Sequence, residues 1–161
     1  MTHEKGSGPG IYFPPPFLFA GGILLAWLLE SRVHELPVIP VLVSPIVFRS
    51  AGYLLILAGV IIAAWGMITF ARAHTAIIPH KPASSLVDTG PYSFTRNPMY
   101  TGMTLQYLGI AVCLNSGWAF LLLPVVLFLL YHFVIRREER YLSDAFGDTY
   151  DDYRARVKRW V

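Results

Sequence analysis

Two short segments of this chain carry side chains suited to binding a charged, hydroxyl-bearing ligand. The first, residues 90–102, reads GPYSFTRNPMYTG and places Arg96 just before a predicted helix start. The second is the adjacent pair Glu138 and Glu139. A helix N-terminus favours an anion, and a guanidinium forms paired hydrogen bonds with a carboxylate. Glutamate carboxylates accept hydrogen bonds from ribose hydroxyls or pair with an ammonium group. Together, these groups suit a zwitterionic cofactor.

A purely structural interpretation fits the same residues. Asn97 is a good helix N-cap, Pro98 is a good first helical residue, and Arg96 can contact lipid head groups. Glu138 and Glu139 can form a solvated helix end. The residue types alone leave both interpretations open.

In combination, the two segments resemble the signature of the isoprenylcysteine carboxyl methyltransferase and phospholipid methyltransferase family, which reads Arg-His-Pro-x-Tyr-x-Gly and then Glu-Glu. The resemblance runs from about Phe70 to the C-terminus. It implies that S-adenosylmethionine binds in a cytoplasm-facing pocket, that S-adenosylhomocysteine is the product, and that a lipophilic acceptor enters from the bilayer.

The matched motifs and the residues around them give a set of expected site residues. Arg96, Glu138 and Glu139 are expected to be catalytic. The expected cofactor-binding residues are His80, Gly90, Pro91, Tyr92, Arg96, Asn97, Pro98, Tyr100, Gly102, Glu138 and Glu139. The chain departs from the signature at Asn97, where histidine is more usual. Asparagine donates and accepts hydrogen bonds but does not titrate near neutral pH, so a role that needs a protonated histidine does not carry over.

Methyl transfer from a sulfonium needs little acid–base chemistry, because the methyl group is already activated. The enzyme must hold a nucleophile in line and exclude water, and such orientation contributes roughly 7–11 kcal/mol. A carboxylate or thiolate acceptor needs no base. An amine must first lose its proton, and His80, Glu138 or Glu139 could then accept it.

The composition predicts a membrane protein of one domain. Of the 161 residues, 55% are hydrophobic and 14% charged, whereas a soluble domain has about 25% charged residues. The net charge of +3 is weak support for nucleic-acid binding, and we expect none. The single cysteine, Cys113, excludes an internal disulfide, and the scattered histidines do not form a metal-ligand pattern.

Apolar run lengths predict an all-α, polytopic fold with about four transmembrane helices, since about 20 apolar residues span a bilayer. We place them at residues 16–32, 51–71, 98–114 and from near Trp118, in an uncharged run that extends to Ile135. A small-residue stripe in the second helix, Gly59, Ala63 and Gly66, predicts close packing against another helix. The Pro-punctuated residues 36–47 are expected to form a loop at the interface. A C-terminal amphipathic helical tail, broken at Gly147, should pack over the membrane face.

Charge counts predict the orientation. Eleven of the 13 Lys and Arg residues lie in the N-terminal tail, the second loop and the C-terminal segment, and two, Arg32 and Arg49, lie in the first loop. The positive-inside rule then places both termini in the cytoplasm. Residues 1–70 would supply two N-terminal helices, and residues 71–161 the cofactor-binding half of a single domain.

The sequence does not identify the methyl acceptor. A prenylated cysteine carboxylate, a phospholipid ethanolamine group, and a small hydrophobic thiol or acid all suit entry from the bilayer, and the short chain favours a small lipophilic or lipid acceptor. Membrane lipids are expected partners, and no obligatory protein partner is evident. Two alternatives remain: a sterol-type reductase that uses NADPH, whose tail is somewhat similar, and a non-enzymatic membrane scaffold.

Overall fold

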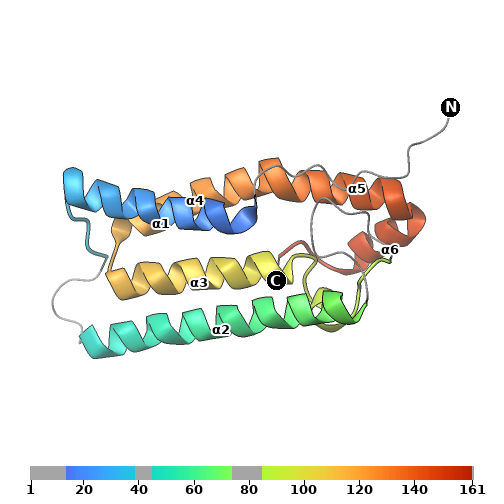
Figure 1. Cartoon of the computed structure of the whole chain (residues 1–161), viewed down its shortest axis with the longest axis horizontal. Helices are drawn as coiled ribbons and strands as arrows, with labels where there is room; N and C mark the ends of the chain where they lie inside the picture. Colours follow the sequence, from blue (N-terminus) through green and yellow to red (C-terminus); the bar gives the residue numbers. More distant parts are fainter. Residues whose placement is uncertain (1–13, 39–44, 74–84, 161) are drawn as a thin grey trace.

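The computed structural model describes residues 14–38, 45–73 and 85–160, and these form an all-helical fold. It contains six α-helices, a short 3-10 helix and a π-helical turn: α1 (Pro15–Arg32), α2 (Pro45–Arg72), η1 (Gly90–Ser93), α3 (Pro98–Leu114), α4 (Gly117–Leu130), η2 (Tyr131–Ile135), α5 (Arg136–Phe146) and α6 (Asp148–Arg156). Four long helices lie side by side, while α5 continues the line of α4 and α6 turns back at one end (Figure 1). The predicted all-α class is confirmed.

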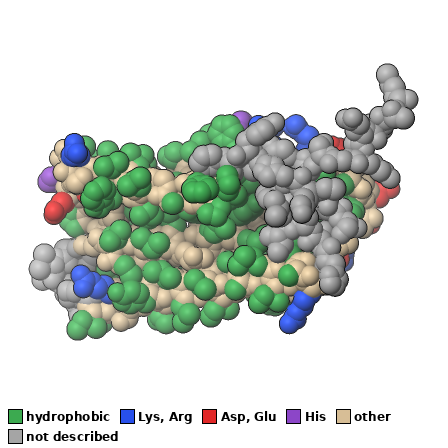
Figure 2. Space-filling view, in the orientation of Figure 1, with side chains coloured by type: hydrophobic (Ala, Val, Ile, Leu, Met, Phe, Trp, Pro, Cys, Tyr) green, Lys and Arg blue, Asp and Glu red, His purple; other side chains and the backbone are tan. Residues whose placement is uncertain are grey.

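Two continuous helices, Ile46–Arg72 and Gly117–Phe146, are long and apolar enough to cross a membrane. Helices α1 and α3 are shorter, at 18 and 17 residues. Large apolar side chains remain exposed along the bundle, and the visible face is mainly hydrophobic between its two ends (Figure 2). This surface suits lipid contact, because an apolar face of this size is uncommon on a soluble monomer. The count of four spans stays a prediction.

The second helix begins earlier than expected. Helix α2 starts at Pro45, so residues 45–47 belong to the helix and not to the predicted loop. Proline is tolerated there because the N–H that it lacks has no partner in the first helical turn. Within the same predicted loop, Pro37 forms an isolated bridge with Ser116, and the Val38 N–H donates to Asn115 Oδ1 at 3.1 Å. Residues 39–44 lie outside the described ranges.

The fourth helix begins one residue before the expected Trp118 and continues past the uncharged run. It runs from Gly117 through the π-helical turn to Phe146, although the sequence changes from apolar to charged at Arg136. A change in polarity marks where a helix can leave lipid, but it does not end backbone hydrogen bonding. The predicted break at Gly147 is confirmed, because this glycine has a φ of 52° and separates α5 from α6.

Helices α2 and α3 make backbone contact through glycines. A Cβ atom added to Gly59 would lie 2.5 Å from the carbonyl oxygen of Gly102, and one added to Gly109 would lie 2.6 Å from that of Gly52. Ala63 faces Gly102 in the same seam. The predicted small-residue stripe of α2 therefore packs closely, and its partner is α3, the helix that begins at the Arg96–Asn97 segment.

We predict that Gly59→Ala lowers the stability of the bundle by about 1–3 kcal/mol, because the added methyl group forces α2 and α3 apart. The matched control is Gly21→Ala in α1, where an added Cβ meets nothing within 4 Å. The control should stay within about 1 kcal/mol of the wild type or gain stability, since alanine is the better helix former. The free energy of unfolding in detergent, measured for both variants, checks this, and equal effects would contradict the close contact.

Candidate functional site

The two chemistry-bearing segments meet at the end of the bundle where α3 begins and where α5 follows α4 and η2 (Figure 1). Arg96 Nη1 lies 3.0 Å from Glu139 Oε1, and the two side chains are only 10% and 16% exposed. The expected convergence of the segments is therefore observed. A largely buried ion pair of this kind needs further partners to offset the loss of hydration.

A second arginine supplies those partners. Arg159 Nε donates to Glu139 Oε1 at 2.8 Å, and Arg159 Nη2 donates to Oε2 at 2.9 Å. This bidentate contact raises the pKa of the Arg159 guanidinium above its ordinary value. The guanidinium also lies 4.9 Å from the ring centroid of Tyr131, in cation–π geometry. Sequence reasoning counted Arg159 only among the basic residues of the tail.

The neighbouring carboxylate has a different partner. Tyr100, a buried residue of α3, donates its hydroxyl to Glu138 Oε1 at 2.7 Å. The two adjacent glutamates thus have different hydrogen-bond partners: Glu139 contacts two guanidinium groups, and Glu138 contacts a phenol. An arrangement of this kind can hold a positively charged or hydroxyl-bearing group near Glu138 without competition from Arg96.

Two buried donors at this end have no hydrogen-bond partner within the described part of the chain. They are the hydroxyl of Tyr92 and Nε of Arg96. Tyr92 lies in η1, packs against Phe70 with ring centroids 5.0 Å apart, and is 5% exposed. Burial raises the pKa of its hydroxyl far above the ordinary value, so the group stays a neutral donor. Unpaired buried donors are costly and are expected to have a ligand or water as partner.

Two further tyrosines complete this end of the molecule, and neither was predicted as a site residue. Arg96 Nη1 donates to the hydroxyl of Tyr150 at 3.4 Å, and the hydroxyl of Tyr153 donates to the backbone oxygen of Tyr92 at 2.8 Å. Both tyrosines are buried in α6, and burial raises the pKa of each hydroxyl. Their i, i+3 spacing was visible in the sequence, but it gave no indication of their partners.

The backbone after α6 lies against the Arg96–Asn97 segment, and we call residues 157–160 the C-terminal strap. The Arg96 N–H donates to the Lys158 carbonyl at 2.9 Å. The Arg159 carbonyl accepts from Thr95 Oγ1 at 2.9 Å and from Asn97 Nδ2 at 3.1 Å. Asn97 occupies the N-cap position of α3, but its side chain makes no capping bond. The structural interpretation of Asn97 as a side-chain cap is therefore wrong.

The other predicted residues fall into separate groups. Gly90, with a φ of +59°, and Pro91 form the tight start of η1, and Pro98 is buried at the first position of α3. Gly102 faces α2, where its contacts are to Gly59 and Ala63. His80 lies outside the described residues. No group of three or more His, Cys, Asp or Glu side chains placed to hold a metal occurs in the ranges described.

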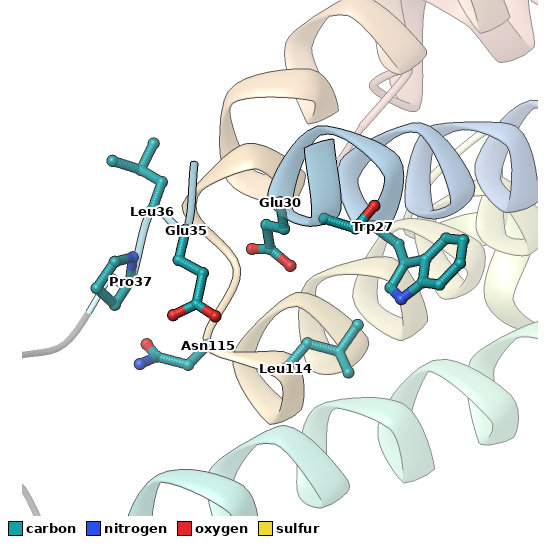
Figure 3. A pocket seen from close by; sticks show the side chains of 8 residues that line it. Trp27, Glu30, Glu35, Leu36, Pro37, Leu114 and Asn115 are labelled. Atoms are coloured by element: carbon teal, nitrogen blue, oxygen red, sulfur yellow. The ribbon is translucent and has the colours of Figure 1, made fainter. Parts of the chain in front are cut away.

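Two hollows lie away from this cluster. One, of about 400 Å³, is at the opposite end of the bundle, where the carboxylates of Glu30 and Glu35 point into the space beside Asn115 (Figure 3). The other is an apolar groove of about 550 Å³ between α1 and α3, with Phe19, Met103 and Gln106 among its lining residues. Neither contains a predicted site residue.

Comparison with known proteins decides the family. The model of the phospholipid methyltransferase family matches residues 47–149, which include Arg96, Glu138 and Glu139. The chain belongs to the phospholipid methyltransferase family. This membership and the two long apolar helices indicate a membrane protein.

Several similar proteins are named as methyltransferases, and others are named as metal-resistance proteins. The chain is 38% identical over 72 residues to the protein-S-isoprenylcysteine O-methyltransferase of Schizosaccharomyces pombe, covering 45% of this chain and 30% of that protein. It is 30% identical to isoprenylcysteine O-methyltransferase B of Arabidopsis thaliana, covering 68% of this chain and 57% of that protein. It is 26% identical to the phosphatidyl-N-methylethanolamine N-methyltransferase of Emericella nidulans, covering 93% of this chain and 72% of that protein.

The chain thus spans less than two thirds of the length of the two isoprenylcysteine relatives. No solved structure is significantly similar to it.

We predict that Glu139→Gln lowers the free energy of unfolding by roughly 3–5 kcal/mol, because it leaves two guanidinium groups without their carboxylate. The matched control is Asp151→Asn, which makes the same chemical change in an exposed pair with Arg154 at 3.8 Å. An exposed pair contributes at most about 1 kcal/mol. Denaturation in mixed micelles measures both, and a Glu139→Gln variant as stable as the control would rule out the shared carboxylate as a structural anchor.

Proposed function

We propose that this chain transfers a methyl group from S-adenosylmethionine to a lipophilic acceptor. The observation that carries the proposal is the buried Arg96–Glu139 pair, which lies beside unpartnered donors on Tyr92 and Arg96. These residues belong to the two segments that the family match covers. The relatives that are named as methyltransferases support the same reaction class.

The residues present fit this cofactor. The unpartnered Tyr92 hydroxyl and Arg96 Nε are donors suited to its carboxylate, and the Glu138 carboxylate is an acceptor suited to its ammonium or ribose hydroxyls. When bound, S-adenosylmethionine supplies a methyl group on a positively charged sulfur, and S-adenosylhomocysteine remains. No proton transfer is needed for a carboxylate or thiolate acceptor.

The chain contributes mainly binding and orientation. Arg96 binds the anionic end of the cofactor, and Glu139 holds Arg96 in place. Tyr92, Tyr150 and Tyr153, all 5% exposed or less, restrict water on this side of the site. Correct orientation of two reactants contributes roughly 7–11 kcal/mol, which is enough to account for much of the catalysis of such a transfer. For an amine acceptor, the proton would go to a nearby base, with Glu138 as the candidate among the described residues.

The acceptor is proposed to approach through lipid. The groove between α1 and α3 is lined mostly by apolar side chains, and Met103 lies one helical turn from Tyr100. A hydrocarbon chain in that groove would place its polar end towards Tyr100 and Glu138. This supports a lipid-like acceptor, with an isoprenylcysteine carboxylate as the first candidate and a phospholipid ethanolamine group as the second.

The proposed topology has four spans with both termini in the cytoplasm. Its support is the eleven-to-two division of Lys and Arg between the two sides. In this orientation, the Arg96–Glu139 end faces the cytoplasm, where the water-soluble cofactor is available.

We predict that the purified, folded chain binds S-adenosylhomocysteine in calorimetry and that Arg96→Gln abolishes measurable binding. Tyr92→Phe should weaken the free energy of binding by about 0.5–1.5 kcal/mol, because it removes one neutral hydrogen-bond donor. The matched control is Tyr53→Phe on α2, whose side chain is 63% exposed. The proposal fails if the folded wild type does not bind, or if the two tyrosine variants bind equally well.

Identification of the product tests the acceptor. Incubation with a methyl-labelled cofactor and a membrane extract should place the label in the lipid fraction. A label released by mild base as volatile methanol indicates a methyl ester and a carboxylate acceptor, whereas a label that stays non-volatile indicates an N-methylated head group or an S-methylated thiol. Label confined to water-soluble products would contradict a lipophilic acceptor.

A further inference from the structure

We propose that Arg159 is a positioning residue for the cofactor site, acting through Glu139, and that Asn97 holds Arg159 in place. The C-terminal strap is then part of the site, although it lies outside both predicted motifs. This inference rests on the proposed function, because its effect is read as affinity for the cofactor product.

The Glu139 carboxylate is shared between two arginines. Arg159 contacts both of its oxygens, whereas Arg96 contacts only Oε1 through Nη1. A bidentate Arg96–Glu139 pair would occupy more of the Arg96 donors. Because Arg159 takes the bidentate position, Arg96 Nε keeps no partner among the described residues. Arg159 thereby leaves a buried donor of Arg96 available to a ligand.

Arg159 itself is fixed from three directions. Its carbonyl accepts hydrogen bonds from Thr95 Oγ1 and Asn97 Nδ2, and its guanidinium lies over the Tyr131 ring. Its side chain is 33% exposed, compared with 10% for Arg96, so it lies on the outer side of the carboxylate. This placement suits a residue that orients Glu139 and does not itself contact the cofactor.

Asn97 is 9% exposed and donates its amide N–H to the strap. A backbone carbonyl requires a hydrogen-bond donor and no titratable group. A neutral asparagine therefore meets the need at this position, where the family signature more usually has histidine. Asn97 acts on the site through Arg159, and the earlier assignment of Asn97 as a cofactor ligand is replaced by this positioning role.

A double-mutant cycle on the full chain tests the inference through the affinity for S-adenosylhomocysteine, measured by calorimetry. Arg159→Gln should weaken binding by about tenfold or more, as expected for loss of hydrogen bonds to a charged group. In the Glu139→Gln background, the same change should have little further effect, because residues that act through one contact are not additive. The control Arg156→Gln, an exposed arginine three residues earlier, should match the wild type.

The inference would be overturned if the losses of affinity caused by Arg159→Gln and Glu139→Gln were additive, or if Arg159→Gln and Arg156→Gln bound equally well. Either result would leave the proposed function intact. A folded wild type that does not bind would overturn both. If Arg159→Gln does not fold, Arg159→Lys replaces it, since lysine keeps the charge but cannot form the bidentate contact. Asn97→His, which retains an N–H donor, should bind at least several-fold more tightly than Asn97→Leu, and equal binding by these two variants would contradict the role of Asn97.

Discussion

The carboxylate of Glu139 joins three parts of the chain that are distant in sequence. Arg96 reaches it from the segment before α3, and Arg159 reaches it from the C-terminal strap. Charges removed from water are stable only when they are well paired and hydrogen-bonded, so each member of this group requires the other two. This shared contact therefore joins the segment before α3, helix α5 and the C-terminal strap.

The bundle determines where that contact can form. Helices α2 and α3 approach to backbone distance at Gly59 and Gly102, which fixes the start of α3 relative to the apolar core. Glu139 belongs to one continuous helix from Gly117 to Phe146, and its position along this helix determines where its carboxylate lies relative to the bundle. The two glutamates therefore reach Tyr100 and Arg96 without a loop between them and the bundle. Such placement on rigid elements suits a reaction that depends mainly on orientation.

Much of the fold was predictable, because apolar run length and proline position indicate helices directly. The early start of α2 was missed because Pro45 can begin a helix as well as interrupt one. The Arg96–Glu139 contact was predictable from the two motifs. The Arg159 contact was not, because it depends on the chain reversal at Gly147, and no local pattern relates residues 139 and 159.

An experimental structure of the full chain with S-adenosylhomocysteine tests the central claim most directly. The account predicts that the ligand lies within hydrogen-bonding distance of the Tyr92 hydroxyl and Arg96 Nε, while Arg159 keeps both oxygens of Glu139. A ligand bound in the hollow beside Glu30 and Glu35 at the opposite end, or one that contacts neither Tyr92 nor Arg96, would contradict it.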